Sequence, residues 1–501
     1  RHLRGHLPGD WPHPDINTAV WFRWHLWQRL QSLESPTFAP ELYHPDGMDV
    51  TLQIWNLGVA LLQSPLVAIL GPLPGYNASL LFLAAFNGLA GYLLGLVVGR
   101  GRRGPAILAA AILLSSNFAW VEMIQGRAEQ GFLAFAALYV AGLVILRRRG
   151  GRGMAVATGL ALAAAGLCYW FYAAFLALPL LGLALASLAR PRPDRRALEA
   201  LAIVLGVAVL AMLPAAIPIL TRMAAPDSVY AAAVAQTTNV TALVDGLRAR
   251  YCATLIQTFV WPLAPFPQRV GAGLPFAVIA VLGCTLAWRA ARQPAGFLPW
   301  IALLGLLMAM GPQLMLRVQQ PLTVLGTAVP LPSALMDQLP LFERLWWPYR
   351  WIALTAVGAA GCGAALVAAL PAGRRADLLA VVLALAVLIE VRAMFVYAPY
   401  TAIAGDPQPL DVPGFLVELG EEPGEHPLLQ LPLRRVDDAA VIYMSYHRQP
   451  VDGGPGYEDD MLIEPSYLRR TSENEALYAL GRMAWGQEVP DVEDPRGELL
   501  G

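Results

Sequence analysis

Lysine is absent from this chain, and both cysteine and charge are scarce. All 35 basic residues are arginine, and charged residues make up 14% of the 501 positions, against 57% hydrophobic residues. So little charge excludes an ordinary soluble domain of this size and predicts a protein whose solvent is the lipid bilayer. We interpret the exclusive use of arginine as a base-composition habit, typical of a GC-rich bacterium, and not as a phosphate-binding device.

The four cysteines and the distribution of charge exclude further classes. Cys168, Cys252, Cys284 and Cys362 are far apart in the sequence, so neither a disulfide framework nor a zinc-binding spacing exists. Acidic residues are concentrated in positions 398–501, and arginines in the short loops between apolar runs. This separation is a topological pattern, and it gives no sign of a nucleic-acid partner.

Ten long apolar runs are the strongest positive signal. Each has about the length that a membrane-spanning helix needs. The runs cover residues 76–98, 105–120, 131–146, 154–170, 171–188, 200–219, 274–288, 297–316, 351–370 and 379–396. The sequence therefore predicts an all-α polytopic membrane domain.

Arginine clusters follow every second run and predict the orientation. The clusters are Arg100/Arg102/Arg103, Arg147/Arg148/Arg149/Arg152, Arg190/Arg192/Arg195/Arg196, Arg289/Arg292 and Arg374/Arg375. Short arginine-rich loops stay in the cytoplasm. Residues 1–75, 221–272, 317–350 and 398–501 are therefore expected outside it, in a multi-pass protein of a bacterial inner membrane.

Three domains follow from this topology. Residues 1–75 form a first extracytoplasmic loop, in which 50–70 is expected to be an interfacial or re-entrant helix pair bent at Ser64-Pro65. Residues 76–397 form the membrane domain. Residues 398–501 form a small extracytoplasmic α/β domain, with strands expected at 428–433 and 439–446. An outside start needs a preceding span, so we expect one before Arg1, and the tail is expected to be truncated.

Glycines inside one of the apolar runs have a packing interpretation. Gly91, Gly95 and Gly99 repeat every fourth position and offer a smooth ridge to a neighbouring helix. The literal G-x-G-x-x-G match that begins at Gly99 follows a membrane helix and no strand, so it does not indicate a dinucleotide site.

The first outer loop concentrates residues that carry chemistry. Its tryptophans, Trp21, Trp24 and Trp27, have the simple interpretation of an interfacial aromatic anchor. Carboxylates gain nothing from such anchoring, so Asp15 and the YHPDGMD stretch at 43–49 need another reason.

Five stretches resemble motifs of bacterial polytopic GT-C-type, glycosyltransferase family 39-like, membrane enzymes. They are GDWPHPDINTAVWF at 9–22, YHPDG at 43–47, PLVAILGPLPGYN at 65–77, LPLFERLWWPYRWIAL at 339–354, and LLQLPL with YMSYHRQPVDGGPGY in 428–457. The resemblance touches nearly the whole chain, although each motif is degenerate. The chain departs from the family at 125–130, where QGRAEQ replaces a G-H-x-x segment.

The resemblance implies a GT-C fold and transfer of a sugar from a polyprenyl-phosphate donor to an acceptor at the outer face. Such transfer needs a carboxylate base and cations that hold the departing phosphate. Asp15 is the expected base, because its spacing from Asn17-Thr18 matches the Asn-Thr of the family motif. Asp10, which directly follows Gly9 as the family's Asp commonly does, is the alternate.

The remaining site residues are predicted from their loops. Arg127, Arg344 and Arg350 are the expected phosphate clamp, because a guanidinium matches phosphate oxygens. Each also has the simpler interpretation of a solvated or headgroup-facing charge. The expected acceptor or pocket residues are His44, Asp46 and His447.

A divalent cation, Mg²⁺ or Mn²⁺, is a further possibility in this sequence. Glu122 with Asp15 would hold it through carboxylate oxygens. The plainer interpretation of Glu122 is a carboxylate at a helix end, and a structural turn is the plainer interpretation of the region around His447.

Two other functions stay open. A surface-polysaccharide polymerase or ligase also acts on lipid-linked sugars. A flippase for such lipids is a transporter, but transporters place ionisable residues at mid-membrane and often carry two related halves, and neither feature is evident in this sequence.

Overall fold

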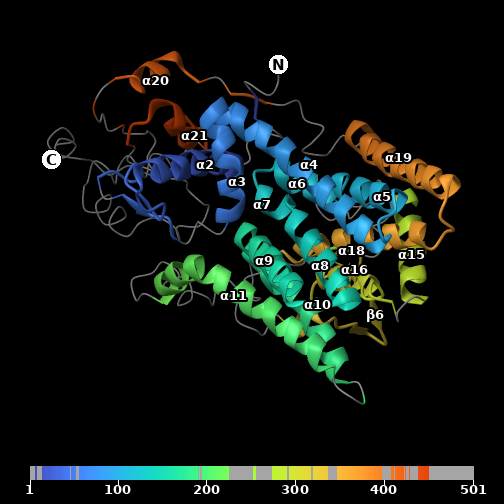
Figure 1. Ribbon diagram of the computed structural model, residues 1–501. Coiled ribbons are helices and arrows are strands. Elements are labelled where there is room, and N and C mark those ends of the chain that lie inside the picture. Colours follow the sequence, from blue (N-terminus) through green and yellow to red (C-terminus); the bar gives the residue numbers. More distant parts are fainter. Residues whose placement is uncertain are drawn as a thin grey trace. The chain divides into compact units, whose positions relative to one another are not determined.

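The computed structural model describes residues 6–7, 14–45, 47–51, 56–189, 191, 194–224, 252–254, 274–289, 293–317, 320–336, 347–397, 408–410, 412–422, 424, 428 and 438–450. Figure 1 shows the helices and strands along the chain, which divides into two compact units by its internal contacts. Unit 1 comprises Arg1–Ser79, Ala215–Thr237 and Pro407–Gly501, and unit 2 comprises Leu80–Pro214 and Thr238–Asp406.

Helices dominate unit 2, and all ten predicted apolar runs contain one. They are α4 (Pro72–Val98, which begins in unit 1), α5 (Arg103–Leu114), α6 (Asn117–Ile124), α7 (Ala128–Gly131), α8 (Ala134–Arg149), α9 (Arg152–Cys168), α10 (Trp170–Leu188), α11 (Arg195–Ala224, which ends in unit 1), α15 (Leu274–Arg289), α16 (Leu298–Ala309), α18 (Ile352–Ala368) and α19 (Arg374–Tyr397). Within the described residues, six helices or stacked helix pairs are long and apolar enough to cross a membrane. The prediction of a multi-pass membrane protein is confirmed.

One run ends earlier than expected. The apolar run at 297–316 is helical only to Ala309, and its last residues enter strand β4 (Met315–Arg317). β4 pairs with β5 (Gln320–Pro321), and β6 (Thr323–Val324) pairs with β7 (Thr327–Ala328). A short helix, α17 (Ser333–Met336), follows.

Small residues let the helices of unit 2 approach closely. A Cβ atom at Gly95 would lie 2.5 Å from the Cα of Ala106 in α5, so the predicted glycine ridge does pack against a neighbouring helix. The same holds at the centre of the bundle, where a Cβ at Gly358 of α18 would lie 2.5 Å from the backbone nitrogen of Ala302 in α16. In lipid, helix association depends on such close contact.

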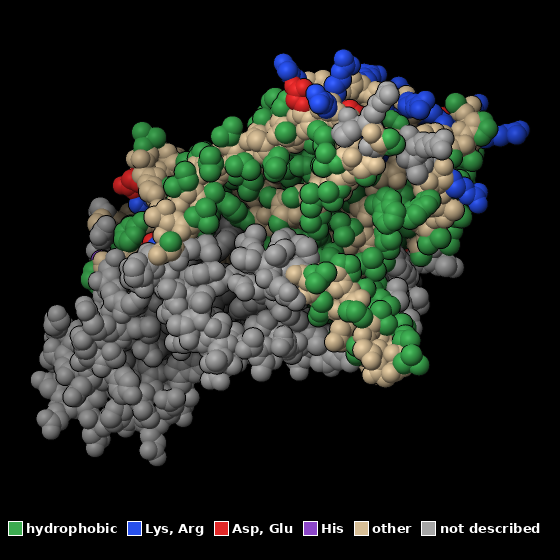
Figure 2. Space-filling model, turned by 90° about the horizontal axis from the view of Figure 1, so that it is seen from below, with side chains coloured by type: hydrophobic (Ala, Val, Ile, Leu, Met, Phe, Trp, Pro, Cys, Tyr) green, Lys and Arg blue, Asp and Glu red, His purple; other side chains and the backbone are tan. Residues whose placement is uncertain are grey.

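Arginine side chains gather along one edge of the described surface, beside a broad hydrophobic area (Figure 2). Two arginines near helix ends donate to carbonyl groups at helix C-termini. Arg102 Nη1 donates to the carbonyl oxygens of Ala368 and Leu370, at 3.1 and 2.9 Å. Arg148 Nη2 donates to the carbonyl oxygen of Val98 at 3.1 Å. Cations at these ends satisfy free carbonyls and complement the helix dipole.

Unit 1 joins the first segment of the chain to the last. Helix α2 (Pro14–Ser32) packs against α3 (Leu57–Leu70) and α21 (Asp438–His447). Strand β1 (His6–Leu7) pairs antiparallel with β8 (Gln408–Pro409). The remaining elements are the β2–β3 pair (Phe38–Ala39 with Met48–Asp49) and α20 (Gly414–Leu419).

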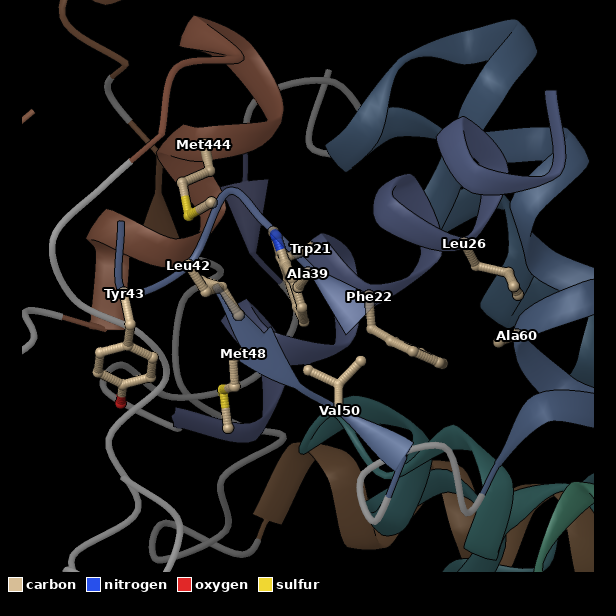
Figure 3. Close-up of a cluster of buried hydrophobic side chains, with 10 residues drawn as sticks. All are labelled: Trp21, Phe22, Leu26, Ala39, Leu42, Tyr43, Met48, Val50, Ala60 and Met444. Carbon is tan, nitrogen blue, oxygen red and sulfur yellow. The ribbon is translucent and has the colours of Figure 1, made fainter. Parts of the chain in front are cut away.

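The core of unit 1 draws on four elements. Figure 3 shows the cluster, in which Trp21 and Phe22 of α2 come together with Met444 of α21 and with residues of the β2–β3 segment. The other members are Leu26, Ala39, Leu42, Tyr43, Met48, Val50 and Ala60. Trp21 is completely buried, so this tryptophan is a core residue and not an interfacial anchor.

Two sequence predictions are wrong in unit 1. Residues 57–70 form one helix that continues through Pro65, and the break falls at Gly71, where φ is +89°. Residues 439–446, expected as a strand, lie in helix α21. Short apolar runs do not distinguish the two structures by themselves, and here the packing of Met444 into the α2 core determines the helix.

Candidate functional site

A tight turn between α6 and α7 brings two predicted residues together in unit 2. Helix α6 ends at Ile124, and Gly126 adopts a φ of +87°, in the left-handed region that glycine tolerates. The backbone nitrogen of Arg127 then donates to the carbonyl oxygen of Glu122 at 2.8 Å. The chain thus folds back, and the Arg127 side chain reaches the Glu122 carboxylate.

Glu122 is completely buried and has both carboxylate oxygens engaged. Oε2 accepts from Arg127 Nε at 2.6 Å, and Oε1 accepts from the Tyr349 hydroxyl at 3.0 Å. Tyr349 lies in a 3₁₀ turn, η4 (Pro348–Trp351), that leads into α18. A buried carboxylate is costly unless it is paired and hydrogen-bonded, so this contact stabilises the position of both partners.

Arg350 lies in the same cluster. Its guanidinium carbon is 4.3 Å from the ring centroid of Trp347 and 5.8 Å from that of Tyr169, at the start of α10. Its charge acts on Tyr349, Glu122 and Arg127. Arg350 Nε is buried and has no hydrogen-bond partner among the residues that the structure describes. We name Glu122, Arg127, Tyr349, Arg350 and Tyr169 the arginine cluster.

The surroundings of the arginine cluster contain residues that the sequence did not single out. Gln125 accepts from Arg127 Nη2, and the Tyr172 hydroxyl donates to the carbonyl oxygen of Gln130. Glu129 is close enough for its charge to act on Tyr169. The signals were available: Gln125, Glu129 and Gln130 lie in the QGRAEQ stretch, and Tyr172 in CYWFY.

The arginine cluster lies at the end of the bundle that is away from the arginine-rich turns. Helix α5 begins at Arg103, at one end of the bundle, and the chain reaches Glu122 near the end of the following helix, α6. Helix α18 starts beside Arg350 and ends at Ala368, whose carbonyl binds Arg102. The α5–α6 segment and α18 therefore both place the arginine cluster at the end of the bundle opposite the arginine-rich turns.

Asp15 belongs to unit 1 and begins α2. It lies in the first turn, where a negative charge complements the helix dipole, and it is half-buried. Asn17, two positions further along the helix, is 1% exposed. The alternate base Asp10, the pocket residue Asp46 and the clamp residue Arg344 lie outside the described residues.

The two predicted histidines also lie in unit 1. His44 is half-buried and precedes Pro45 through a cis peptide bond. His447 ends α21 and is 1% exposed, and its Nδ1 accepts from the backbone nitrogen of Gln449 at 3.0 Å. Burial lowers the pKa of His447 to about 4. The side chain is therefore neutral at neutral pH, with its proton on Nε2.

Helix α2 also carries buried ionic contacts that sequence reasoning missed. Arg23, 1% exposed, donates from Nε to Gln63 Oε1 at 2.8 Å. His25 Nδ1 and Arg29 Nη2 both bind the Glu41 carboxylate. Burial by itself raises the pKa of Glu41, but the hydrogen bond and charge of His25, together with Arg29, lower it below the usual value.

A metal site was predicted at Glu122 with Asp15. In the described part of the chain, no three His, Cys, Asp or Glu side chains are grouped as metal ligands. Each Glu122 oxygen already accepts a hydrogen bond, one of them from a cation. The arrangement fits an ion pair better than a metal ligand, and the metal role stays a prediction.

The fold is that of GT-C membrane glycosyltransferases, as the motifs predicted. The sequence matches no protein-family model and no curated protein sequence. Two similar solved structures are of oligosaccharyltransferase from Archaeoglobus fulgidus. The structure with a tethered acceptor peptide containing the NVT sequon has a TM-score of 0.50 and 14% identity, and covers 90% of this chain and 60% of that chain. The complex of AglB with an inhibitory peptide and a dolichol-phosphate has a TM-score of 0.51 and 13% identity, over 96% and 65%.

A third similar structure is ArnT from Cupriavidus metallidurans bound to undecaprenyl phosphate, with a TM-score of 0.46, 16% identity, and coverage of 93% of this chain and 85% of that chain. The chain spans less than two thirds of the length of the two oligosaccharyltransferase chains, at 60% and 65%. At these identities, the likeness to the two oligosaccharyltransferase structures establishes the fold alone.

Proposed function

We propose that this protein transfers a sugar from a polyprenyl-phosphate-linked donor to an acceptor at the extracytoplasmic face of a bacterial inner membrane. The observation that carries the proposal is the arginine cluster: Arg127 and Arg350, from segments far apart in the sequence, lie around Glu122 at one end of a GT-C bundle. The similar AglB structure contains a dolichol-phosphate, a lipid of the donor class.

The chemistry assigns one task to each group. In a direct displacement, the acceptor hydroxyl gives its proton to the Asp15 carboxylate, with Asp10 as the alternate base, while the acceptor oxygen bonds to the anomeric carbon. The bond from that carbon to the phosphate oxygen breaks, and the electron pair leaves with the polyprenyl phosphate. Arg350 and Arg127 stabilise the phosphate charge as it develops.

The side chains of Arg127 and Arg350 make different contacts, which bear on how each could bind the phosphate. Arg127 Nε donates to Glu122 and its Nη2 donates to Gln125, so these two side chains position the guanidinium. The Arg350 guanidinium lies over the rings of Trp347 and Tyr169, and its buried Nε has no hydrogen-bond partner in the described part of the chain. We therefore assign the stronger donor contact to Arg350, with Arg344 of the preceding loop as a further candidate.

The acceptor side is assigned to unit 1. His44, Asp46 and His447 are the proposed pocket residues, because they belong to the extracytoplasmic segments that the topology predicts. His447 is neutral and donates only from Nε2, so it suits an uncharged hydroxyl group better than a phosphate.

The test is binding of a polyprenyl phosphate to the purified protein in lipid nanodiscs. Loss of one charged hydrogen-bond donor costs about 1.5 to 3 kcal/mol, or roughly ten- to hundred-fold in affinity. Arg350→Ala is expected to weaken binding by that factor. Arg152→Ala is the matched control, because Arg152 is a surface arginine whose side chain is 83% exposed and pairs with Glu199. Equal affinity in the two variants would remove Arg350 from the phosphate site.

A further inference from the structure

The hairpin formed by β6 and β7 (residues 322–329) has an apolar tip. Val324 is 55% exposed and Leu325 is 101% exposed, and Leu335 in the following helix α17 is 72% exposed. No charged residue occurs anywhere from 318 to 336. An uncharged segment of this length whose large apolar side chains are exposed is energetically unfavourable in contact with water.

The turn itself is unusual for its sequence. Leu325 has a φ of +52° and Gly326 a φ of +79°, so both central residues are left-handed, as in the type I′ turns that join two strands. Asn, Asp or Gly is favoured at the first of these positions, and a bulky side chain there is strained. Leu325 therefore accepts backbone strain and also exposes its whole side chain. The exposure of this side chain is unfavourable in water and favourable in lipid.

The connection to α16 places this hairpin near the bilayer surface. Helix α16 has 12 residues, which span about 18 Å, against the roughly 30 Å of the hydrocarbon layer. It follows Arg289 and the arginine-rich turn, so its end at Ala309 points away from that turn. The chain leaves the helix before the layer is fully crossed. The ladder that carries the hairpin begins three residues later, where the backbone nitrogen of Leu331 donates to the carbonyl oxygen of Pro312 at 2.9 Å.

The backbone of the hairpin is suited to such a place. The backbone nitrogen of Val329 donates to the carbonyl oxygen of Leu322 at 3.0 Å, and that of Leu322 donates to the carbonyl oxygen of Leu314 at 2.7 Å. The backbone nitrogen of Leu314 in turn donates to the carbonyl oxygen of Val329 at 2.9 Å. Backbone groups next to hydrocarbon must be satisfied within the protein, and these closed contacts meet that requirement.

We propose that the tip of the β6–β7 hairpin, Val324 and Leu325, inserts into the lipid surface on the side of the membrane away from the arginine edge. The partner is the boundary between phospholipid headgroups and acyl chains, where apolar side chains without nearby charge are stabilised. The inference does not depend on the reaction that the protein catalyses.

The experiment compares two exposed leucines that have the same local geometry. Leu33, at the end of α2, has a φ of +58° and is 94% exposed, but it lies next to Glu34, which pairs with Arg29. Leu325→Cys and Leu33→Cys are each labelled with an environment-sensitive fluorophore in phospholipid nanodiscs. The parent chain, labelled in parallel, supplies the blank for the four native thiols.

The proposal expects opposite results at the two positions. The label at 325 should show a blue-shifted emission, quenching by spin-labelled phospholipid and loss of quenching by aqueous iodide, and the label at 33 should show the reverse. Iodide quenching at 325 as strong as at 33 would overturn the proposal. Protection from both quenchers at 325 would also overturn it, because the tip would then be covered by protein.

Discussion

At the scale of single residues, Glu122 is the charge on which the arginine cluster depends. It is the buried counter-ion of Arg127, and Tyr349 holds its second oxygen from another part of the chain. Removing one partner of a buried ion pair is strongly destabilising, because the other charge stays in a poorly solvated place.

We expect Glu122→Gln to lower the free energy of unfolding by about 3 to 5 kcal/mol. Tyr349→Phe keeps the ion pair and removes one hydrogen bond to a charged group, so its expected cost is smaller, about 1.5 to 3 kcal/mol. The measurement is thermal unfolding of both variants in the same nanodiscs. A larger loss in Tyr349→Phe than in Glu122→Gln would mean that the ion pair is not the stabilising contact.

The stability of the folded protein is expected to depend on pH through His447, and the direction of this dependence follows from its lowered pKa. Burial lowers its pKa from 6.5 to about 4, so the folded protein binds a proton there less readily than the unfolded chain does. Its stabilising contribution is complete above about pH 6.5 and is lost as the pH falls toward about 4.

We therefore expect the unfolding temperature of the parent protein to fall between pH 7 and pH 5. His447→Gln, which keeps a side-chain acceptor for the Gln449 nitrogen, should have a flatter profile. Glu41 contributes in a lower range, because its pKa lies below the usual 4.5. Parallel profiles for the two proteins down to pH 5 would assign the dependence to another group.

At the scale of helices, close packing through glycine determines the contact between α4 and α5. The Cβ of a larger residue at Gly95 would overlap the backbone of Pro105 and Ala106, at 2.6 and 2.5 Å. Backbone atoms cannot move aside as a side chain can.

Gly95→Leu is expected to destabilise the bundle by about 1 to 3 kcal/mol or more. Gly182→Leu in α10 is its matched control, since a Cβ there would meet nothing within 4 Å and the helix is equally apolar. Thermal unfolding and the yield of folded protein in detergent test this pair. Equal stability of the two variants would show that α4 and α5 can separate without cost.

The helices were predictable from the sequence because a segment that crosses lipid must be apolar over its whole length and must satisfy its backbone hydrogen bonds internally. A long apolar run therefore indicates a helix. Arg102 and Arg148, which bind helix-end carbonyls, belong to clusters that the sequence placed at one face of the membrane. The helical structure of 439–446 was not predictable, because a short apolar run suits a strand or a helix until its packing partner is known. That partner is α2, more than 400 residues earlier in the chain.

The candidate site was predictable in part for the same reason. Arg127, Arg350 and Glu122 were selected separately, from their loops and from the resemblance. Their convergence was not accessible, since Tyr349 and Glu122 are 227 residues apart and only the folded bundle brings them together. Nor did the sequence indicate that Glu122 would be the partner of Arg127, because a helix-end carboxylate has many possible uses.

At the scale of the whole molecule, the residues proposed for the reaction belong to two compact units. Unit 1 carries Asp15 and the predicted acceptor residues, and unit 2 carries the arginine cluster. In the proposed transfer, the base Asp15 is a residue of unit 1 and the phosphate-binding arginines Arg127 and Arg350 are residues of unit 2.

The most direct test follows a labelled sugar on a panel of polyprenyl-phosphate-linked donors, given to the purified protein in proteoliposomes with membrane extract as the source of acceptor. The account predicts that the label leaves the lipid and that free polyprenyl phosphate accumulates. Because a positioned general base contributes about 10² to 10⁴ in rate, Asp15→Asn should be slower by that factor while it still binds the lipid. Collapse in Asp10→Asn with normal turnover in Asp15→Asn would move the base to Asp10. A label that stays on the lipid and crosses the bilayer would contradict the account and identify a flippase.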